Sequence, residues 1–141
     1  MEQLKSILIV DDEFGVRESL KMILKPIFQV HTAADGKEAL QSIQNGKIDL
    51  VTLDLNMPGL SGIEVLRQIK ENNPEIEVII ITAYSNAENK LEANRYGAGG
   101  IISKPFNIPE VIDNLNKSLK RQTYNLTLKN YSLYNSLVVR N

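Results

Sequence analysis

The stretch Leu50-Val51-Thr52-Leu53-Asp54 decides the fold of this chain. An apolar, β-branched run that ends in a carboxylate is typical of a strand covered on both faces of a parallel sheet. Three further apolar runs end in polar residues: Ile7–Val10 before Asp11-Asp12, Val78–Ile81 before Thr82, and Ile101-Ile102 before Ser103-Lys104. Ligands bind outside the carboxyl ends of such strands. The sequence therefore predicts one crevice lined by three carboxylates, a hydroxyl and an ammonium group.

Stretches of helical periodicity alternate with these apolar runs, which is the pattern of repeated βα units around a parallel sheet. We expect helices where apolar residues recur at helical spacing, in residues 16–24, 39–45, 63–72, 86–96 and 108–119. Residues 28–33 alternate apolar and polar side chains, which predicts an edge strand. Right-handed crossovers then favour the strand order 2-1-3-4-5, which places the four functional strand ends side by side.

The helix expected at residues 86–96 differs from the others because its apolar stripe is thin. It has few apolar residues beyond Ala87, Leu91 and Tyr96 to pack against a core. A helix anchored by so few apolar side chains is free to move or to expose a face to a partner.

The composition limits the class of protein. The chain has 141 residues, of which 43% are hydrophobic, as expected for one globular domain with a small tail. The absence of cysteine excludes a disulfide framework and a thiolate metal site. The N-terminus lacks the apolar core of a signal peptide, and no apolar stretch approaches the roughly 20 residues of a membrane span. We therefore expect a soluble, cytoplasmic protein with no membrane contact.

Charge is distributed unevenly along the chain. From Asn114 onward there are no acidic residues and five basic ones: Lys117, Lys120, Arg121, Lys129 and Arg140. The preceding part has 11 basic and 17 acidic residues, a net charge of −6. We interpret residues 1–120 as the folded domain and residues 121–141 as a basic extension or linker, which leaves open a truncated output module. A solvated linker and a contact with an acidic partner both fit this charge pattern.

The local structure of the extension has two interpretations. Leu119, Leu126 and Leu133 recur every seven residues, which predicts a continuation of the preceding helix. Tyr124, Leu126 and Leu128 alternate with polar residues, which fits a strand equally well. The sequence leaves both open.

The polar strand ends suit phosphoryl transfer to a carboxylate, because a hard cation removes the repulsion between two anionic reactants. Mg²⁺ prefers octahedral oxygen coordination with few carboxylates and several waters. Asp11 and Asp12 can bind it directly and through water, while Asp54 supplies one ligand oxygen and attacks phosphorus. Lys104 offsets charge on the phosphoryl oxygens and the Thr82 hydroxyl donates to one of them.

Each of these residues also has a simpler explanation when taken alone. Asp12 can cap a helix, and Asp54 can begin the turn at residues 56–59. Thr82 can be an ordinary strand-end residue and Lys104 a surface charge. Four such coincidences at four neighbouring strand ends favour a shared site.

The same residues resemble the receiver domain of two-component response regulators. The resemblance extends over about Leu4 to Lys120 and includes the order and spacing of its signature elements. These elements are Asp11-Asp12, Asp54 with Met57-Pro58-Gly59 and Gly62, Thr82-Ala83, and Lys104-Pro105-Phe106. It implies an α/β, flavodoxin-like (βα)5 three-layer sandwich, with a five-stranded parallel sheet flanked by helices.

The resemblance also implies roles for individual residues. Asp54 accepts a phosphoryl group from a sensor histidine kinase or a histidine phosphotransfer protein, and the conformation then switches to control an output partner or domain. Asp11, Asp12, Asp54 and the backbone carbonyl of Asn56 hold Mg²⁺. Lys104 contacts the phosphoryl group and precedes a cis peptide to proline. The chain is then a signalling receiver rather than an enzyme, with no nucleic-acid binding by the receiver itself.

One position departs from the family pattern. The family often has Tyr or Phe three residues before the lysine, and this chain has Ile101. A branched aliphatic side chain cannot reproduce the inward turn of an aromatic ring. We expect phosphoryl uptake to survive, while the route of the signal outward differs. The face formed by residues 86–96, the short strand before Lys104 and residues 108–119 is expected to bind a partner or a second copy.

Two other classes of protein share part of this pattern. Haloacid-dehalogenase-like phosphatases also use a nucleophilic Asp, a Thr or Ser, a Lys and Mg²⁺. They need a second Asp two positions after the nucleophile, where this chain has Asn56, which cannot protonate a leaving group. A pseudo-receiver that binds partners without phosphorylation is the third class, and the complete set of site residues argues against it.

Overall fold

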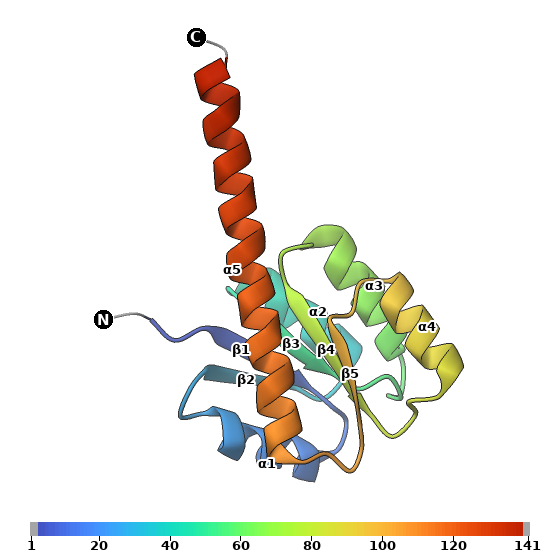
Figure 1. Cartoon of the computed structure of the whole chain (residues 1–141). Helices are drawn as coiled ribbons and strands as arrows, with labels where there is room; N and C mark the ends of the chain where they lie inside the picture. Colours follow the sequence, from blue (N-terminus) through green and yellow to red (C-terminus); the bar gives the residue numbers. More distant parts are fainter. Residues whose placement is uncertain (1–2, 140–141) are drawn as a thin grey trace.

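Strands and helices alternate along the whole chain in the computed structural model, which describes residues 3–139 (Figure 1). The strands are β1 (Ser6–Val10), β2 (Gln29–Ala33), β3 (Leu50–Leu53), β4 (Glu77–Thr82) and β5 (Gly100–Ser103). The helices are α1 (Phe14–Leu24), α2 (Gly36–Asn45), α3 (Gly62–Asn72), α4 (Ala87–Arg95) and α5 (Ile108–Val139). All strands pair in parallel in the order β2-β1-β3-β4-β5, so the predicted topology is confirmed.

Alternation along the buried strands creates a core on each face of the sheet. In β1, Ile7 and Ile9 point into one hydrophobic cluster, while Leu8 and Val10 point into the other. The first cluster is covered by α1 and α5, and the second by α2, α3 and α4. β1, β3 and β4 are buried throughout, whereas β2 alternates in exposure as predicted for an edge strand.

Side-chain caps fix where several helices begin. The Asp35 carboxylate accepts a hydrogen bond from the Glu38 N–H at 2.8 Å, and the Glu38 carboxylate accepts one from the Ala34 N–H at 3.1 Å. Asn86 caps α4 through the Asn89 N–H at 2.8 Å. These bonds satisfy backbone donors that a helix start leaves free.

α4 is weakly anchored, as its sequence predicts. Ala93 is its only fully buried residue, and Leu91 is 72% exposed. The helix therefore presents most of its surface to the outside.

α5 continues without interruption through residues 121–139, so the helical interpretation of the extension is correct and the strand interpretation is wrong. It leaves the body of the protein at the N-terminal edge of the sheet and projects away from it (Figure 1). Polar contacts fix the point of departure. Arg121 Nε donates to Glu77 Oε1 at 2.6 Å, and Gln122 Nε2 donates to the Asp49 carbonyl at 2.6 Å. Within residues 3–139, no helix combines the length and apolar character needed to span a membrane.

Two glycines in helices have opposite surroundings, which gives a matched pair of substitutions. A Cβ on Gly62 would collide with the Asp54 carbonyl oxygen and with the backbone of Leu55, whereas a Cβ on Gly15 would meet no atom within 4 Å. We expect Gly62→Ala to lower the free energy of unfolding by about 2 kcal/mol or more. Gly15→Ala should raise it by about 0.5–1 kcal/mol through helix propensity. Urea denaturation measures both, and equal effects would contradict the close approach at Gly62.

Candidate functional site

The C-terminal edge of the sheet brings the predicted acidic residues together. Asp11 and Asp12 follow β1, and Asp54 follows the neighbouring strand β3. One carboxylate oxygen of each residue lies within 4.8 Å of the others. Asp11 and Asp54 are buried, at 2% and 5% exposure, while Asp12 is exposed. The site therefore has two buried carboxylates and one that is exposed to solvent.

Lys104, which follows β5, reaches into this cluster. Its Nζ donates to Asp11 Oδ2 at 2.7 Å and to Asp54 Oδ2 at 3.2 Å. Glu13 Oε1 lies farther away, at 3.7 Å from the same nitrogen. The ammonium group thus bridges two carboxylates that come from different strands.

Burial and the neighbouring charges have opposite effects on the pKa values of Asp11 and Lys104. Burial raises the pKa of Asp11, and the hydrogen bond and charge of Lys104 offset only part of this effect. Burial alone lowers the pKa of Lys104, but its hydrogen bonds and attraction to Asp11 and Asp54 outweigh burial and leave that pKa above its usual 10.5. The lysine is therefore held as a cation beside the carboxylates.

Backbone donors orient the two buried carboxylates, and one side-chain donor holds the backbone of Asp11. The Glu13 N–H donates to Asp11 Oδ1 at 2.9 Å, and the Asn56 N–H donates to Asp54 Oδ1 at 3.3 Å. Arg17 Nη1 donates to the Asp11 backbone carbonyl at 2.8 Å. The sequence analysis did not identify Arg17, because nothing in a single sequence indicates that a helical arginine turns back toward the preceding strand end.

Thr82 ends β4 beside the site and is fully buried. Its carbonyl accepts a hydrogen bond from the Lys104 N–H at 2.9 Å, and its hydroxyl oxygen accepts one from the Tyr84 N–H at 3.2 Å. One residue farther on, the hydroxyls of Ser85 and Ser103 lie 2.5 Å apart. The loop after β4 is thereby tied to the end of β5, a contact that the sequence analysis did not predict.

Two features of β5 and the residues after it concern positions that the sequence singles out. The Lys104–Pro105 peptide bond is cis. Ile101 is half-buried and packs against the hydrophobic cluster on the α3 and α4 side of the sheet. An aliphatic side chain therefore fills this position as part of the core.

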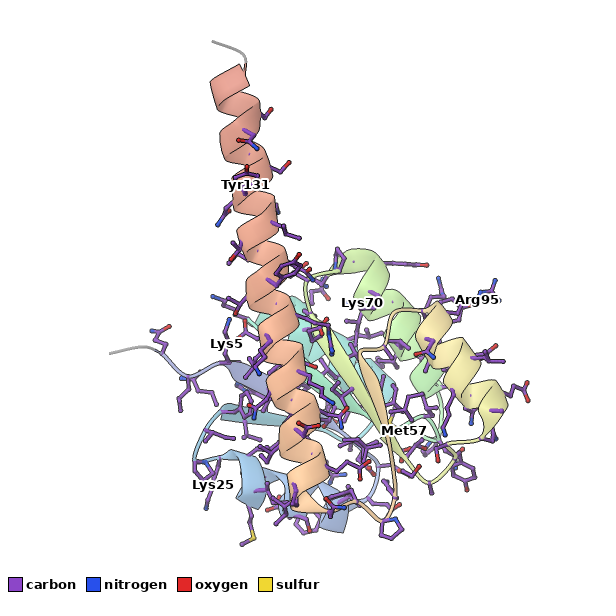
Figure 2. The ribbon with its side chains drawn as sticks, in the orientation of Figure 1. Lys5, Lys25, Met57, Lys70, Arg95 and Tyr131 are labelled. Carbon is purple, nitrogen blue, oxygen red and sulfur yellow. The ribbon has the colours of Figure 1, made fainter. Side chains whose placement is uncertain are left out.

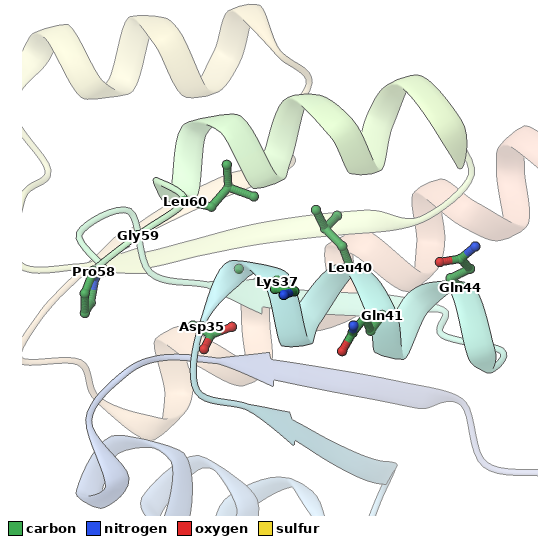
Figure 3. A pocket seen from close by; sticks show the side chains of 9 residues that line it. Asp35, Lys37, Leu40, Gln41, Gln44, Pro58, Gly59 and Leu60 are labelled. Atoms are coloured by element: carbon green, nitrogen blue, oxygen red, sulfur yellow. The ribbon is translucent and has the colours of Figure 1, made fainter.

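A cavity of about 570 Å³ lies away from the acidic cluster, between α2 and the loop after β3 (Figure 3). Leu40 and Leu60 contribute apolar walls, with Lys37 and Asp35 at the side of α2. It includes none of the three clustered carboxylates and not Lys104. Cavity volume therefore does not identify the chemistry, since the convergent charges lie elsewhere.

The oxygen donors of the acidic cluster suit a divalent cation such as Mg²⁺. All three side chains offer hard carboxylate oxygens, which Mg²⁺ prefers. Because Asp12 is exposed, the cluster opens to water, and Mg²⁺ usually keeps several water ligands. The residues present therefore fit this ion.

The comparisons with known proteins agree with the fold. The sequence model of the response regulator receiver domain matches residues 7–116, and this chain belongs to that family. It is 40% identical over 116 residues to sporulation initiation phosphotransferase F of Bacillus subtilis, which covers 82% of this chain and 94% of that protein. Receiver domains are signalling modules of two-component systems and bind Mg²⁺ at an acidic site.

Two solved structures show the same architecture. A CheY-like receiver domain protein from Methanospirillum hungatei superimposes with a TM-score of 0.84 at 31% identity, over 87% of this chain and 99% of that one. The response regulator TrrA of Thermotoga maritima, in complex with Mg²⁺-BeF, has a TM-score of 0.75 at 38% identity, over 82% and 99%. Several curated response regulators are longer, and this chain spans about half their length.

Replacement of Lys104 tests whether Mg²⁺ binding depends on the lysine. In Lys104→Ala the positive charge beside Asp11 and Asp54 is lost, so we expect Mg²⁺ to bind at least as tightly as in the parent chain. Asp12→Ala should weaken Mg²⁺ binding about tenfold or more, while Glu13→Ala should change it little. Calorimetry or NMR titration measures all three, because the chain has no tryptophan. Loss of Mg²⁺ binding in a folded Lys104→Ala variant would contradict this division of roles.

Proposed function

We propose that this chain is the phosphoacceptor of a two-component system and that Asp54 takes the phosphoryl group. The observation that carries the proposal is the convergence of Asp11, Asp12 and Asp54 within 4.8 Å, bridged by Lys104. The donor is a phosphohistidine on a sensor kinase or a phosphotransfer protein. In the transfer, the nitrogen–phosphorus bond breaks and an oxygen–phosphorus bond to Asp54 forms. The imidazole leaves with the bonding electrons and takes up a proton.

Asp11, Asp12, Asp54 and the Asn56 carbonyl are the proposed Mg²⁺ ligands. When bound, Mg²⁺ supplies the positive charge that lowers repulsion between the carboxylate and the phosphoryl donor. Lys104 neutralises charge on the transferred oxygens, for which its ammonium must leave Asp54 and turn to the phosphoryl group. The Thr82 hydroxyl donates to another of these oxygens. Its present acceptor contact with the Tyr84 N–H leaves its proton free for this bond.

The proposed consequence of phosphorylation is a shift between two conformations rather than turnover of a substrate. Thr82 and Lys104 are joined through the Lys104 N–H, and Ser85 is joined to Ser103. Movement of Thr82 toward a phosphoryl group therefore displaces the loop before α4 and the end of β5. The output in this proposal is a downstream partner or an output module, and residues 121–141 are its connection to the receiver, residues 1–120.

Phosphorylation of Asp54 is tested directly by mass. With a small acyl phosphate and Mg²⁺, the chain should gain one phosphoryl mass that hydroxylamine removes, because the product is an acyl phosphate. Asp54→Asn should give no adduct, and Asp49→Asn serves as the control carboxylate outside the site. An unchanged adduct in Asp54→Asn would refute the assignment.

The face formed by α4, β5 and α5 is the proposed docking surface for a partner or a second copy. α4 is weakly anchored, and its loop shares hydrogen bonds with the end of β5, so this face should respond first to phosphorylation. Beryllofluoride with Mg²⁺ should shift NMR resonances in α4 and β5 more than those in α2. A chain ending at Arg121 tests whether the basic extension alters docking. Equal shifts in α2 and α4 would contradict the choice of face.

A further inference from the structure

The part of α5 beyond the body, residues 123–139, forms a helix that projects away from the rest of the chain (Figure 1). We refer to it as the projecting helix. At 1.5 Å per residue it is about 25 Å long. Two of its leucines are outside the core: Leu126 is 59% exposed and Leu133 is 56% exposed. Tyr131 lies on the upper part of the helix (Figure 2) and is 63% exposed.

The composition of the projecting helix is poorly suited to an isolated helix in water. Lys129 is its only charged residue, so it lacks the ion pairs that support exposed helices. Asn, Ser, Thr and Tyr make up most of the remainder, and these residues are mediocre helix formers. A lone helix of this length is marginal even with better residues. The segment therefore needs a partner that covers its apolar side chains.

Leu119, Leu126 and Leu133 form one line along the helix, which we call the leucine stripe. Leu119 still packs against the core of the body, whereas the next two leucines extend the same line into the open. Thr123 and Asn130 lie four residues after Leu119 and Leu126, so the segment repeats as a heptad with leucine at one core position and a polar residue at the other. This repeat is typical of paired helices.

The chemistry of the segment narrows the class of partner. One cation in 17 residues is too few for a nucleic-acid surface, which requires clustered lysines and arginines. An interfacial membrane helix also needs a strongly charged polar face. A second copy of this chain fits, because it offers the same leucine spacing on a helix of equal length that carries a single charge.

The body determines which orientation two copies can adopt. Leu115 and Leu119 share a hydrophobic cluster with Leu20 and Leu24 of α1, so the leucine stripe faces the side on which α1 lies. A parallel partner helix running beside α5 would occupy the position of α1. An antiparallel partner approaches from the free end and meets no such obstacle.

A groove is present where the end of an antiparallel partner would lie. It has a volume of about 490 Å³ and lies between the projecting helix and the N-terminal edge of the sheet. Leu126 and Asn130 line it from the helix, and Pro74, Glu75 and Lys5 line it from the body. A second helix could therefore contact this groove in addition to the leucine stripe.

We infer that two copies of this chain associate through the leucine stripes of their projecting helices, packed antiparallel, whether or not Asp54 is phosphorylated. Tyr124, Leu128 and Tyr131 lie on the opposite side of the helix and remain at the surface, where the tyrosine hydroxyls keep contact with water. The inference does not depend on the proposed phosphoryl transfer.

Sedimentation equilibrium of the full chain tests association. Two short helices form an interface near the lower end of the standard size, so the concentration series should reach about 500 µM. We expect a dimer for the parent chain. Leu126→Asn with Leu133→Asn should weaken association by a factor on the order of 100 or more, because four leucines lose their buried contacts. Tyr124→Asn with Tyr131→Asn is the matched control and should remain dimeric.

A monomer at every concentration for the parent chain would overturn the inference, as would equal weakening by the two double variants. Amide NMR spectra of the body check that each variant remains folded. Asp54→Asn should dimerise like the parent, and the double leucine variant should still take up a phosphoryl group, so failure of one proposal leaves the other testable.

Orientation is tested by disulfide crosslinking, since the chain contains no cysteine of its own. In an antiparallel pair centred near residue 131, the two copies of Asn130 lie almost opposite each other. The two copies of Thr123 are then about 24 Å apart along the axis, which is beyond the reach of a disulfide. Asn130→Cys should therefore form covalent dimers under mild oxidation, and Thr123→Cys should not. Efficient crosslinking of Thr123→Cys would overturn the antiparallel arrangement.

Discussion

The bridge from the Lys104 ammonium to the carboxylates of Asp11 and Asp54 is the interaction on which the site depends. Two carboxylates less than 5 Å apart repel by about 3–4 kcal/mol at the effective dielectric of a protein surface. Burial adds to that cost, as the raised pKa of Asp11 indicates. The lysine offsets part of both penalties, which helps the acidic cluster to persist in the folded chain.

The C-terminal and N-terminal edges of the sheet have different roles in this structure. The C-terminal edge gathers charged residues around Asp54, whereas the N-terminal edge fixes the exit of α5. There, Arg121 pairs with Glu77, its Nη2 donates to the buried Ser118 hydroxyl at 2.9 Å, and Gln122 bonds the Asp49 carbonyl. α5 begins shortly after Lys104 and continues past this second edge, so one rigid element connects the charged site to the projecting helix.

Hydrogen bonds, and not an aromatic side chain, join the loop after Thr82 to the end of β5. Ile101 is part of the core between β5 and the helices that cover that face, and a branched aliphatic has no ring to turn. The Tyr84 N–H holds the Thr82 hydroxyl, and the Ser85 hydroxyl holds that of Ser103. A loop held by hydroxyl contacts near the protein surface can rearrange at lower cost than a packed core, which suits the conformational shift proposed for this segment.

The sequence alone determined the sheet, its strand order and the identity of the acidic cluster. Continuous apolar runs such as Leu50–Leu53 specify buried parallel strands, and chain connectivity then places Asp11, Asp54 and Lys104 at one edge. Periodicity could not decide between helix and strand for residues 121–139, because leucines at a spacing of seven and alternating apolar residues coexist there. The tertiary structure favours the helix, which continues from α5 once Arg121 and Gln122 are fixed to the body. Contacts made by turning side chains, such as Arg17 to the Asp11 carbonyl and Ser85 to Ser103, also required the fold, since they join residues whose proximity depends on three-dimensional packing.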